Sequence, residues 1–349
     1  MKYKSFSKLL LLGFSFVFML ASCTKEGPMG PAGADGQNGT DGTDGVDGNV
    51  TCLVCHSGTN MEQKQAEFAM SEHSVGAIAV DYAGGRASCA PCHSHELFVQ
   101  SMTLGGAVGD VTNPSAWQCS TCHGIHKSFE GKDYALRSTD PINPIFDPSV
   151  TMDLNGNSNL CAICHQSRRA EPNLDIPGDT YNITSTHYGP HHGAQANVVA
   201  GMGFAEIEGS VAYPEQGSNK HLQMASCTGC HMAEFADGQG GHSYIPSLNA
   251  CNECHDANLE DYNYGGVQTE VHELLVELRD HLIALGVVEG DDENGYHPHT
   301  GEFPMVQVQA FFNWVGLEED RSLGAHNPKY VKALLRNSIE ALEGETAAH

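Results

Sequence analysis

The 349-residue sequence predicts a mainly α-helical fold with much irregular loop, in which side chains alone do not fill the core. Hydrophobic residues make up only 40% of the chain and two residues are Trp, which is a thin supply for a globular protein. Helical periodicity is clear only in the last part of the chain, from about residue 266. Before it, a short cysteine and histidine motif recurs from residue 52 to residue 255.

The amino terminus, residues 1–22, has the pattern of an export signal. Three basic residues come first: Lys2, Lys4 and Lys8. The apolar stretch 9–20 that follows is short for a membrane span. The next residues, Ala21-Ser22-Cys23, resemble the end of the lipobox of bacterial lipoproteins. This resemblance implies lipidation of Cys23, export and a membrane anchor; Thr24 favours an outer-membrane lipoprotein that faces the periplasm or the cell surface.

Glycine occupies every third position from Gly27 to Gly48. The run resembles a short collagen-like segment, since only glycine fits at the axis of three packed polyproline-II chains. Pro28 and Pro31 supply little stiffness, so we interpret residues 23–49 as a solvated tether. At about 3.1 Å per residue, its glycine-periodic run would extend to at most about 70 Å. A trimeric stalk, and with it a homo-oligomer, is the alternative.

Twelve of the thirteen cysteines form six Cys-x-x-Cys pairs, each followed directly by histidine. The pairs are Cys52 and Cys55, Cys89 and Cys92, Cys119 and Cys122, Cys161 and Cys164, Cys227 and Cys230, and Cys251 and Cys254. The histidines are His56, His93, His123, His165, His231 and His255.

This motif is typical of covalent haem attachment, in which two thiols bond the haem vinyl groups and the next imidazole lies under the iron. Zinc ribbons, redox pairs and disulfides also use Cys-x-x-Cys, but they do not require the following histidine. The sequence therefore predicts six haem c groups, and residues 50–349 as a hexahaem cytochrome c domain with a haem-filled core and C-terminal helices.

Bis-histidine ligation requires a second imidazole at each iron, and fourteen histidines lie outside the motifs. The candidates are His73, His126, His187 or His191, His221, His242 and His326, with His95 in reserve. His326 precedes Asn327 and Pro328, a pattern typical of a helix cap and first turn that would hold the imidazole rigidly. Methionine ligation is the less economical alternative, because histidine is abundant.

Beyond His255 the apolar residues recur at helical spacing in residues 268–285, 306–315 and 327–342. The stretch from Phe312 to Leu335 resembles the C-terminal region of multihaem cytochromes related to the pentahaem nitrite reductases. That resemblance implies that His326 ligates a haem attached earlier in the chain. The Cys-x-x-Cys-Lys motif that marks the catalytic haem of those reductases does not occur in this sequence.

The formal charge of −26 excludes nucleic acid as a partner, because few basic residues remain to neutralise phosphates. The sequence favours an electron carrier over an enzyme, with other redox proteins or extracellular electron acceptors as partners in anaerobic or extracellular respiration. A multihaem reductase of a nitrogen or sulfur oxyanion is the alternative. It would place an open-site haem near the 187–192 segment, with Tyr188 as proton donor and Arg168 and Arg169 holding the anion. The other role for both arginines is pairing with haem propionates.

Overall fold

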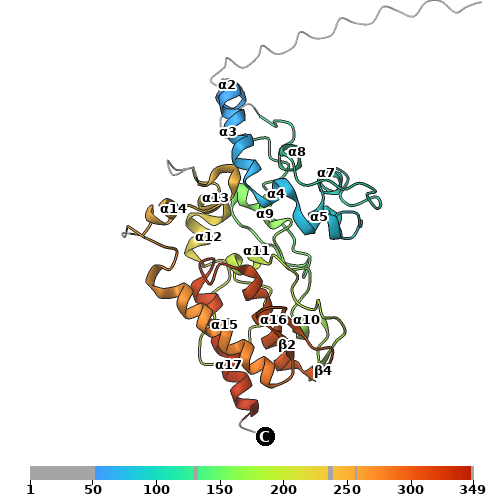
Figure 1. Ribbon diagram of the computed structural model, residues 1–349, viewed down its shortest axis with the longest axis vertical. Helices are drawn as coiled ribbons and strands as arrows, with labels where there is room; N and C mark the ends of the chain where they lie inside the picture. The colour runs from blue at the N-terminus through green and yellow to red at the C-terminus, as the bar shows by residue number, and fades with distance from the viewer. Residues whose placement is uncertain (1–51, 129–132, 235–238, 256–257, 347–349) are drawn as a thin grey trace, which may run out of the picture. The chain divides into compact units, whose positions relative to one another are not determined.

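Short helices joined by irregular loops form the first part of the computed structural model (Figure 1). The structure describes residues 52–128, 133–234, 239–255 and 258–346, all within one compact unit, Asn49–His349. The predicted signal, Cys23 and the tether lie outside the described residues. The helices run over Cys52–His56 (α2), Gly58–Ala69 (α3), Glu72–Val75 (α4), Ala77–Ala83 (α5), Ala90–His93 (α6), His95–Leu104 (α7), Cys119–Cys122 (α8), Asn159–Ala162 (α9), Pro172–Asp175 (α10), Gln195–Ala200 (α11), Lys220–Met224 (α12), Ser226–His231 (α13) and Leu248–Asn252 (α14).

Each attachment motif lies on, or runs into, one of these short helices: α2, α6, α8, α9, α13 and α14. A single helical turn brings two residues three positions apart onto the same side of the chain, which is where two thiols must be to bond one haem. In four motifs the backbone N–H of the histidine donates to the carbonyl of the first cysteine at 2.9–3.2 Å. These histidines are His93, His123, His165 and His255. The turn therefore holds the imidazole close to the thiols.

The predicted C-terminal helices are present as Val267–Ala284 (α15), Met305–Asp320 (α16) and Pro328–Thr346 (α17), and they pack against one another. Their facing sides bury Leu278, Leu282, Phe311, Phe312 and Leu334 completely. Helix α16 continues past its predicted end at residue 315. It passes through Gly316, where a Cβ would lie 2.5 Å from the Phe204 ring, so the absence of a side chain allows this close packing.

Two small antiparallel sheets, which the sequence does not predict, complete the fold. Thr180–Ile183 (β1) pairs with Gly301–Pro304 (β4), and Val288–Asp291 (β2) pairs with Gly295–Pro298 (β3). The strands are four residues long, so they carry too little alternation to be recognised from the sequence. Strand β1 ends shortly before the 187–192 segment, and its pairing with β4 fixes that segment against α16.

Buried amide side chains join the middle of the chain to the C-terminal helices. Asn313 on α16 accepts a hydrogen bond from the Ala205 N–H at 2.9 Å and donates to its carbonyl at 2.8 Å. Asn327, just before α17, donates to the Val198 carbonyl at 3.1 Å. These contacts hold residues 194–213 on the helices and fix the position of His326. Among the described residues, no helix is both long and apolar enough to cross a membrane.

Candidate haem sites

Each of the six motif histidines lies edge to face with, or tilted against, one histidine from outside the motifs. The ring centroids of the pairs are 5.9–6.2 Å apart. The pairs are His56 with His126, His93 with His191, His123 with His242, His165 with His73, His231 with His326, and His255 with His221. Five of the six partners lie 70 or more residues from the motif histidine along the chain, so the tertiary fold creates these pairs.

This spacing fits two imidazoles on opposite sides of one iron. An iron–nitrogen bond is about 2.0 Å and the ring centre lies about 1.1 Å beyond the nitrogen, so two axial rings have centres about 6 Å apart. Rings packed directly against each other as core residues have no reason to repeat this separation six times. The residues present therefore fit six bis-histidine haems, each next to a Cys-x-x-Cys pair that can attach it.

The second ring nitrogen of several paired histidines is held by a hydrogen bond. His123 Nδ1 donates to the Tyr134 carbonyl at 2.7 Å, and His231 Nδ1 donates to the Tyr244 carbonyl at 2.8 Å. His165 Nδ1 lies 3.1 Å from Gln195 Oε1. Ligand histidines in metal sites commonly use one nitrogen in this way, which fixes the ring and presents Nε2 to the metal.

Burial favours the neutral form of several of these imidazoles. It lowers the pKa of His73 to about 4 and that of His191 to about 4, helped in the first case by His165 and in the second by Arg168. Burial also lowers the pKa of His93, His165 and His231. A neutral imidazole is the form that binds a metal, so these five side chains are suited to ligation.

His326 differs from the others because a buried carboxylate lies next to it. Asp320, at the end of α16, is 4% exposed and its Oδ1 lies 2.6 Å from His326 Nδ1. Burial lowers the pKa of His326, but the charge and hydrogen bond of Asp320 outweigh it and the net pKa is raised. The sequence alone does not identify Asp320 as a partner of His326, because its place six residues before a candidate ligand forms no recognisable pattern.

Large apolar side chains are exposed near the first three motifs. Ile125 is 90% exposed, Ile78 81%, and Val108 74%, on segments that run beside α6 and α8. A porphyrin at each motif would cover apolar surface of this kind, which agrees with the low apolar content of the chain.

The two residues that the sequence left open for one ligand, His187 and His191, lie in different surroundings. His191 lies against His93, with ring centroids 5.9 Å apart, whereas His187 is an exposed residue of the loop after β1. The reserve candidate His95 instead places Nδ1 2.8 Å from Thr121 Oγ1. The other candidates, His73, His126, His221, His242 and His326, all lie in the pairs described above.

The residues suggested for a reductase site have other surroundings. Tyr188 is buried in the C-terminal core, with its ring 6.2 Å from that of Phe311, and burial raises the pKa of its hydroxyl. The Arg169 guanidinium lies 5.4 Å from the centre of the Tyr188 ring. Tyr188 therefore packs as a core residue, and every motif imidazole already faces a second imidazole.

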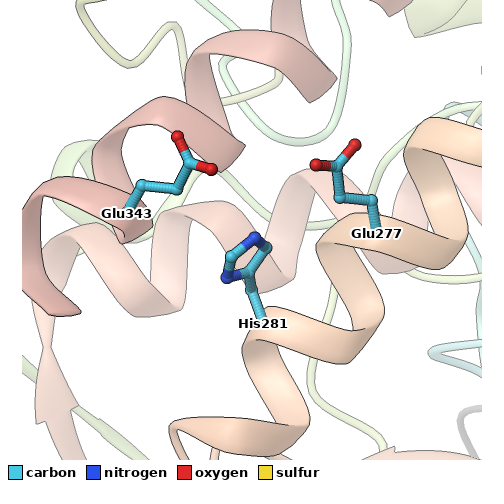
Figure 2. Close-up of side chains that lie close together, drawn as sticks. All are labelled: Glu277, His281 and Glu343. Atoms are coloured by element: carbon cyan, nitrogen blue, oxygen red, sulfur yellow. The ribbon is translucent and has the colours of Figure 1, made fainter.

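A separate group of possible metal ligands lies on the C-terminal helices. Figure 2 shows Glu277 and His281 of α15 and Glu343 of α17 pointing toward one another, with ligand atoms all within 4.8 Å. Both carboxylates are exposed, and exposed acidic groups commonly gather in this way without an ion. The group shares no residue with the histidine pairs.

Comparison with solved structures finds similarity to the crystal structure of the outer cell wall cytochrome OcwA, with a TM-score of 0.50 and 17% sequence identity. The match covers 80% of this chain and 50% of that one, so this chain spans about half the length of the cytochrome that it resembles. The likeness is one of fold. No family model and no curated protein matches the sequence.

Proposed function

We propose that the protein is an electron-transfer protein, a c-type cytochrome that binds six haems with bis-histidine ligation. The observation that carries the proposal is the pairing of all six motif histidines with a second histidine at 5.9–6.2 Å. The similarity of fold to a cytochrome of known structure supports it. Haem c, when bound, supplies a one-electron couple whose potential the axial ligands and their surroundings set.

The chain's own part is to attach, orient and enclose the cofactor. The motif thiols would form the covalent bonds, the paired imidazoles would hold the iron, and carbonyl or carboxylate groups fix the rings through Nδ1. With two protein ligands at each iron, a small substrate would have no direct access to the metal. An electron carrier works with this arrangement, whereas a reductase needs one open position. We therefore do not propose the reductase.

The proposal includes export and attachment to a membrane. The Cys23 motif would place the protein as a lipid-anchored component of the outer membrane, and residues 23–49 would hold the domain away from the lipid. The chain carries a net charge of −26 before the haem propionates are counted. Basic redox proteins, or metal ions and mineral surfaces outside the cell, are partners with complementary charge.

The test of the haem sites uses the full chain produced in a host that attaches haem c. Mass spectrometry of the purified protein should show six haem additions. Low-temperature electron paramagnetic resonance and near-infrared magnetic circular dichroism of the oxidised protein should show only low-spin bis-histidine haem. Fewer than six additions, or a high-spin signal from one haem in the unaltered protein, would contradict the proposal.

The anchor is tested separately. Metabolic labelling with a radioactive fatty acid should label the protein and not its Cys23→Ser variant, and the label should follow the outer-membrane fraction. Protease added to intact cells then reports whether the domain faces outward. Equal labelling of the two proteins would remove the anchor from the proposal and leave the haem sites untouched.

A further inference from the structure

The six sites are not arranged in the order of the chain. We number them 1 to 6 in the order of their motifs, and their contacts with one another can be followed from the cysteines, because the thioether sulfurs are bonded to the edge of the macrocycle. Two sites whose motif sulfurs are neighbours have macrocycle edges that are neighbours as well. Electron tunnelling falls steeply with edge separation, so these contacts define the routes between sites.

Site 4 is in contact with site 2. Cys92 Sγ lies 3.7 Å from the carbonyl oxygen of Ile163 and donates a hydrogen bond to it. Ile163 lies between the two cysteines of the site 4 motif, and Cys92 is the second cysteine of site 2. The attachment edges of the two sites therefore meet directly.

Site 4 is also in contact with site 5. Cys227, the first cysteine of site 5, packs against the apolar cluster that contains Ala162 of the site 4 motif. Next to this contact, Ser158 Oγ lies 3.1 Å from Thr228 Oγ1 and accepts a hydrogen bond from the Thr228 N–H at 3.2 Å. The two motif helices are thus joined side by side.

The third contact of site 4 is with site 3, through aromatic rings. The ring of Tyr244 lies 4.9 Å from that of His73, a site 4 ligand, and 6.3 Å from that of His242, a site 3 ligand.

Tyr244 also reaches site 5, because its carbonyl accepts the hydrogen bond from His231 Nδ1. It does so from a left-handed conformation, with φ 58°, which non-glycine residues seldom adopt. A strained residue of this kind persists where the surrounding structure demands it. Here one residue contacts ligands of sites 3, 4 and 5.

The remaining sites attach to the outside of this group. Site 6 adjoins site 5, since the motif helices α13 and α14 are in contact, and Ala325, next to His326, accepts a hydrogen bond from His221 Nδ1 at 2.6 Å. Site 1 adjoins site 3, because its ligand His126 is three residues from His123.

We infer that site 4 is the junction of a branched relay, in which sites 1 and 3 lead to it on one arm, sites 5 and 6 leave it on a second, and site 2 joins it as a third. The inference rests on the proposed function and goes beyond it, because six bis-histidine haems could equally form one unbranched line. A junction with three ends gives the protein three places at which partners can deliver or take electrons.

The test uses the full haem-loaded chain and two matched variants. Methionine in place of a distal histidine raises the reduction potential of that haem, so His73→Met makes site 4 the first to be reduced, and His191→Met does the same for site 2. Each reduction removes one ferric spin and changes the charge at that site. A potentiometric titration followed by electron paramagnetic resonance then shows which of the remaining ferric signals change. Each signal is assigned to its site by the variant in which the distal histidine of that site alone is replaced.

Reduction of site 4 in His73→Met should alter three other signals, those of sites 2, 3 and 5, whereas reduction of site 2 in His191→Met should alter that of site 4 and leave that of site 5 unchanged. Changes at fewer than three sites in His73→Met, or at sites 1 or 6, would overturn the junction. The proposed function fails in a different way, through a haem count below six in the unaltered protein.

A structure of the unaltered loaded chain gives a second measurement that does not depend on either variant. The macrocycle edge of site 4 should lie closer to those of sites 2, 3 and 5 than to those of sites 1 and 6. Any other order of distances would overturn the junction even if neither variant folds.

Discussion

Asp320 Oδ1 lies 2.6 Å from His326 Nδ1, with the carboxylate buried and the imidazole half-buried. This hydrogen bond has a carboxylate as its acceptor, whereas the others described above that orient paired histidines use carbonyl or amide oxygens. A carboxylate draws the proton of Nδ1 toward itself and makes Nε2 a stronger donor to a metal, which favours ferric over ferrous iron. Site 5, which pairs His326 with His231, should therefore have a low potential.

Replacing Asp320 with Asn keeps a hydrogen-bond acceptor and removes the charge. The variant should raise the potential of one haem by about 60–120 mV, the equivalent of a tenfold to hundredfold change in relative affinity for the two oxidation states of iron. Spectroelectrochemical titration measures the shift. Gln195→Glu makes the opposite change at site 4, since it places a carboxylate where Gln195 Oε1 now lies 3.1 Å from His165 Nδ1. This variant should lower the potential of one haem. Unchanged potentials in both variants would show that these partners only position the rings.

The choice between His187 and His191 can be checked by a pair of matched substitutions. His191→Ala removes the ring that faces His93, so one haem of the six should become five-coordinate and high-spin. His187→Ala changes an exposed loop residue on the same segment and should leave the spectrum of the unaltered protein. Electron paramagnetic resonance of the oxidised proteins distinguishes the two results. A high-spin signal from His187→Ala instead would transfer the ligand role to that residue.

Part of this arrangement could be predicted from the sequence and part could not. The six motif histidines and the C-terminal helices over 268–285 and 327–342 follow from spacing alone, because attachment chemistry and helix periodicity are local properties. Which histidine meets which motif is not local. His73 lies closest in sequence to the first two motifs, yet the fold places its ring 6.0 Å from that of His165 in the fourth.

The reason is that loops without periodicity carry the distal histidines, so their path depends on tertiary contacts. The Asn313 and Asn327 hydrogen bonds fix the segment before α17, and the pairing of β1 with β4 fixes the segment that contains His191. Four-residue strands and single buried amides leave no recognisable signal in the sequence. The same holds for Tyr244, whose importance lies in a left-handed backbone conformation.

We expect that the free energy of unfolding of the C-terminal helices can be lowered without loss of haem from the six motifs. Leu282 of α15 is completely buried, so Leu282→Ala should lower the free energy of unfolding of this region by about 2–5 kcal/mol. The next residue, Ile283, is 39% exposed, and Ile283→Ala should cost no more than about 1 kcal/mol. Denaturant unfolding followed by the fluorescence of Trp314, which lies in this core, measures both.

Both alanine variants should keep six haems by mass spectrometry, since neither residue contacts a motif. Loss of haem from Leu282→Ala alone would show instead that packing of α15 is needed to form site 5 or site 6, whose ligands lie close to the ends of α15 and α17 in the chain.

An ion pair between α15 and α17 makes a pH-dependent contribution to stability. Glu270 lies 2.7 Å from Arg336 and 3.3 Å from Lys332, and the hydrogen bond from Arg336, followed by that from Lys332, lowers the pKa of its carboxyl. A carboxyl whose pKa is lower in the folded state stabilises the fold above its unfolded value, about 4.3, and loses that contribution as the pH falls through the folded value. Because the pair is partly exposed to solvent, the contribution should be about 0.2–1 kcal/mol at neutral pH.

Glu270→Gln should therefore be slightly less stable than the unaltered protein at pH 7, and the two should become equal only once the pH has fallen below the lowered pKa of Glu270 in the folded protein. Denaturant unfolding across this range checks the sign, and added salt should reduce the difference at pH 7, because salt screens exposed pairs. A double-mutant cycle with Arg336→Met isolates the pair from other effects of either substitution. A difference that instead grows as the pH falls would mean that the neutral carboxyl, and not the ion pair, is the stabilising form.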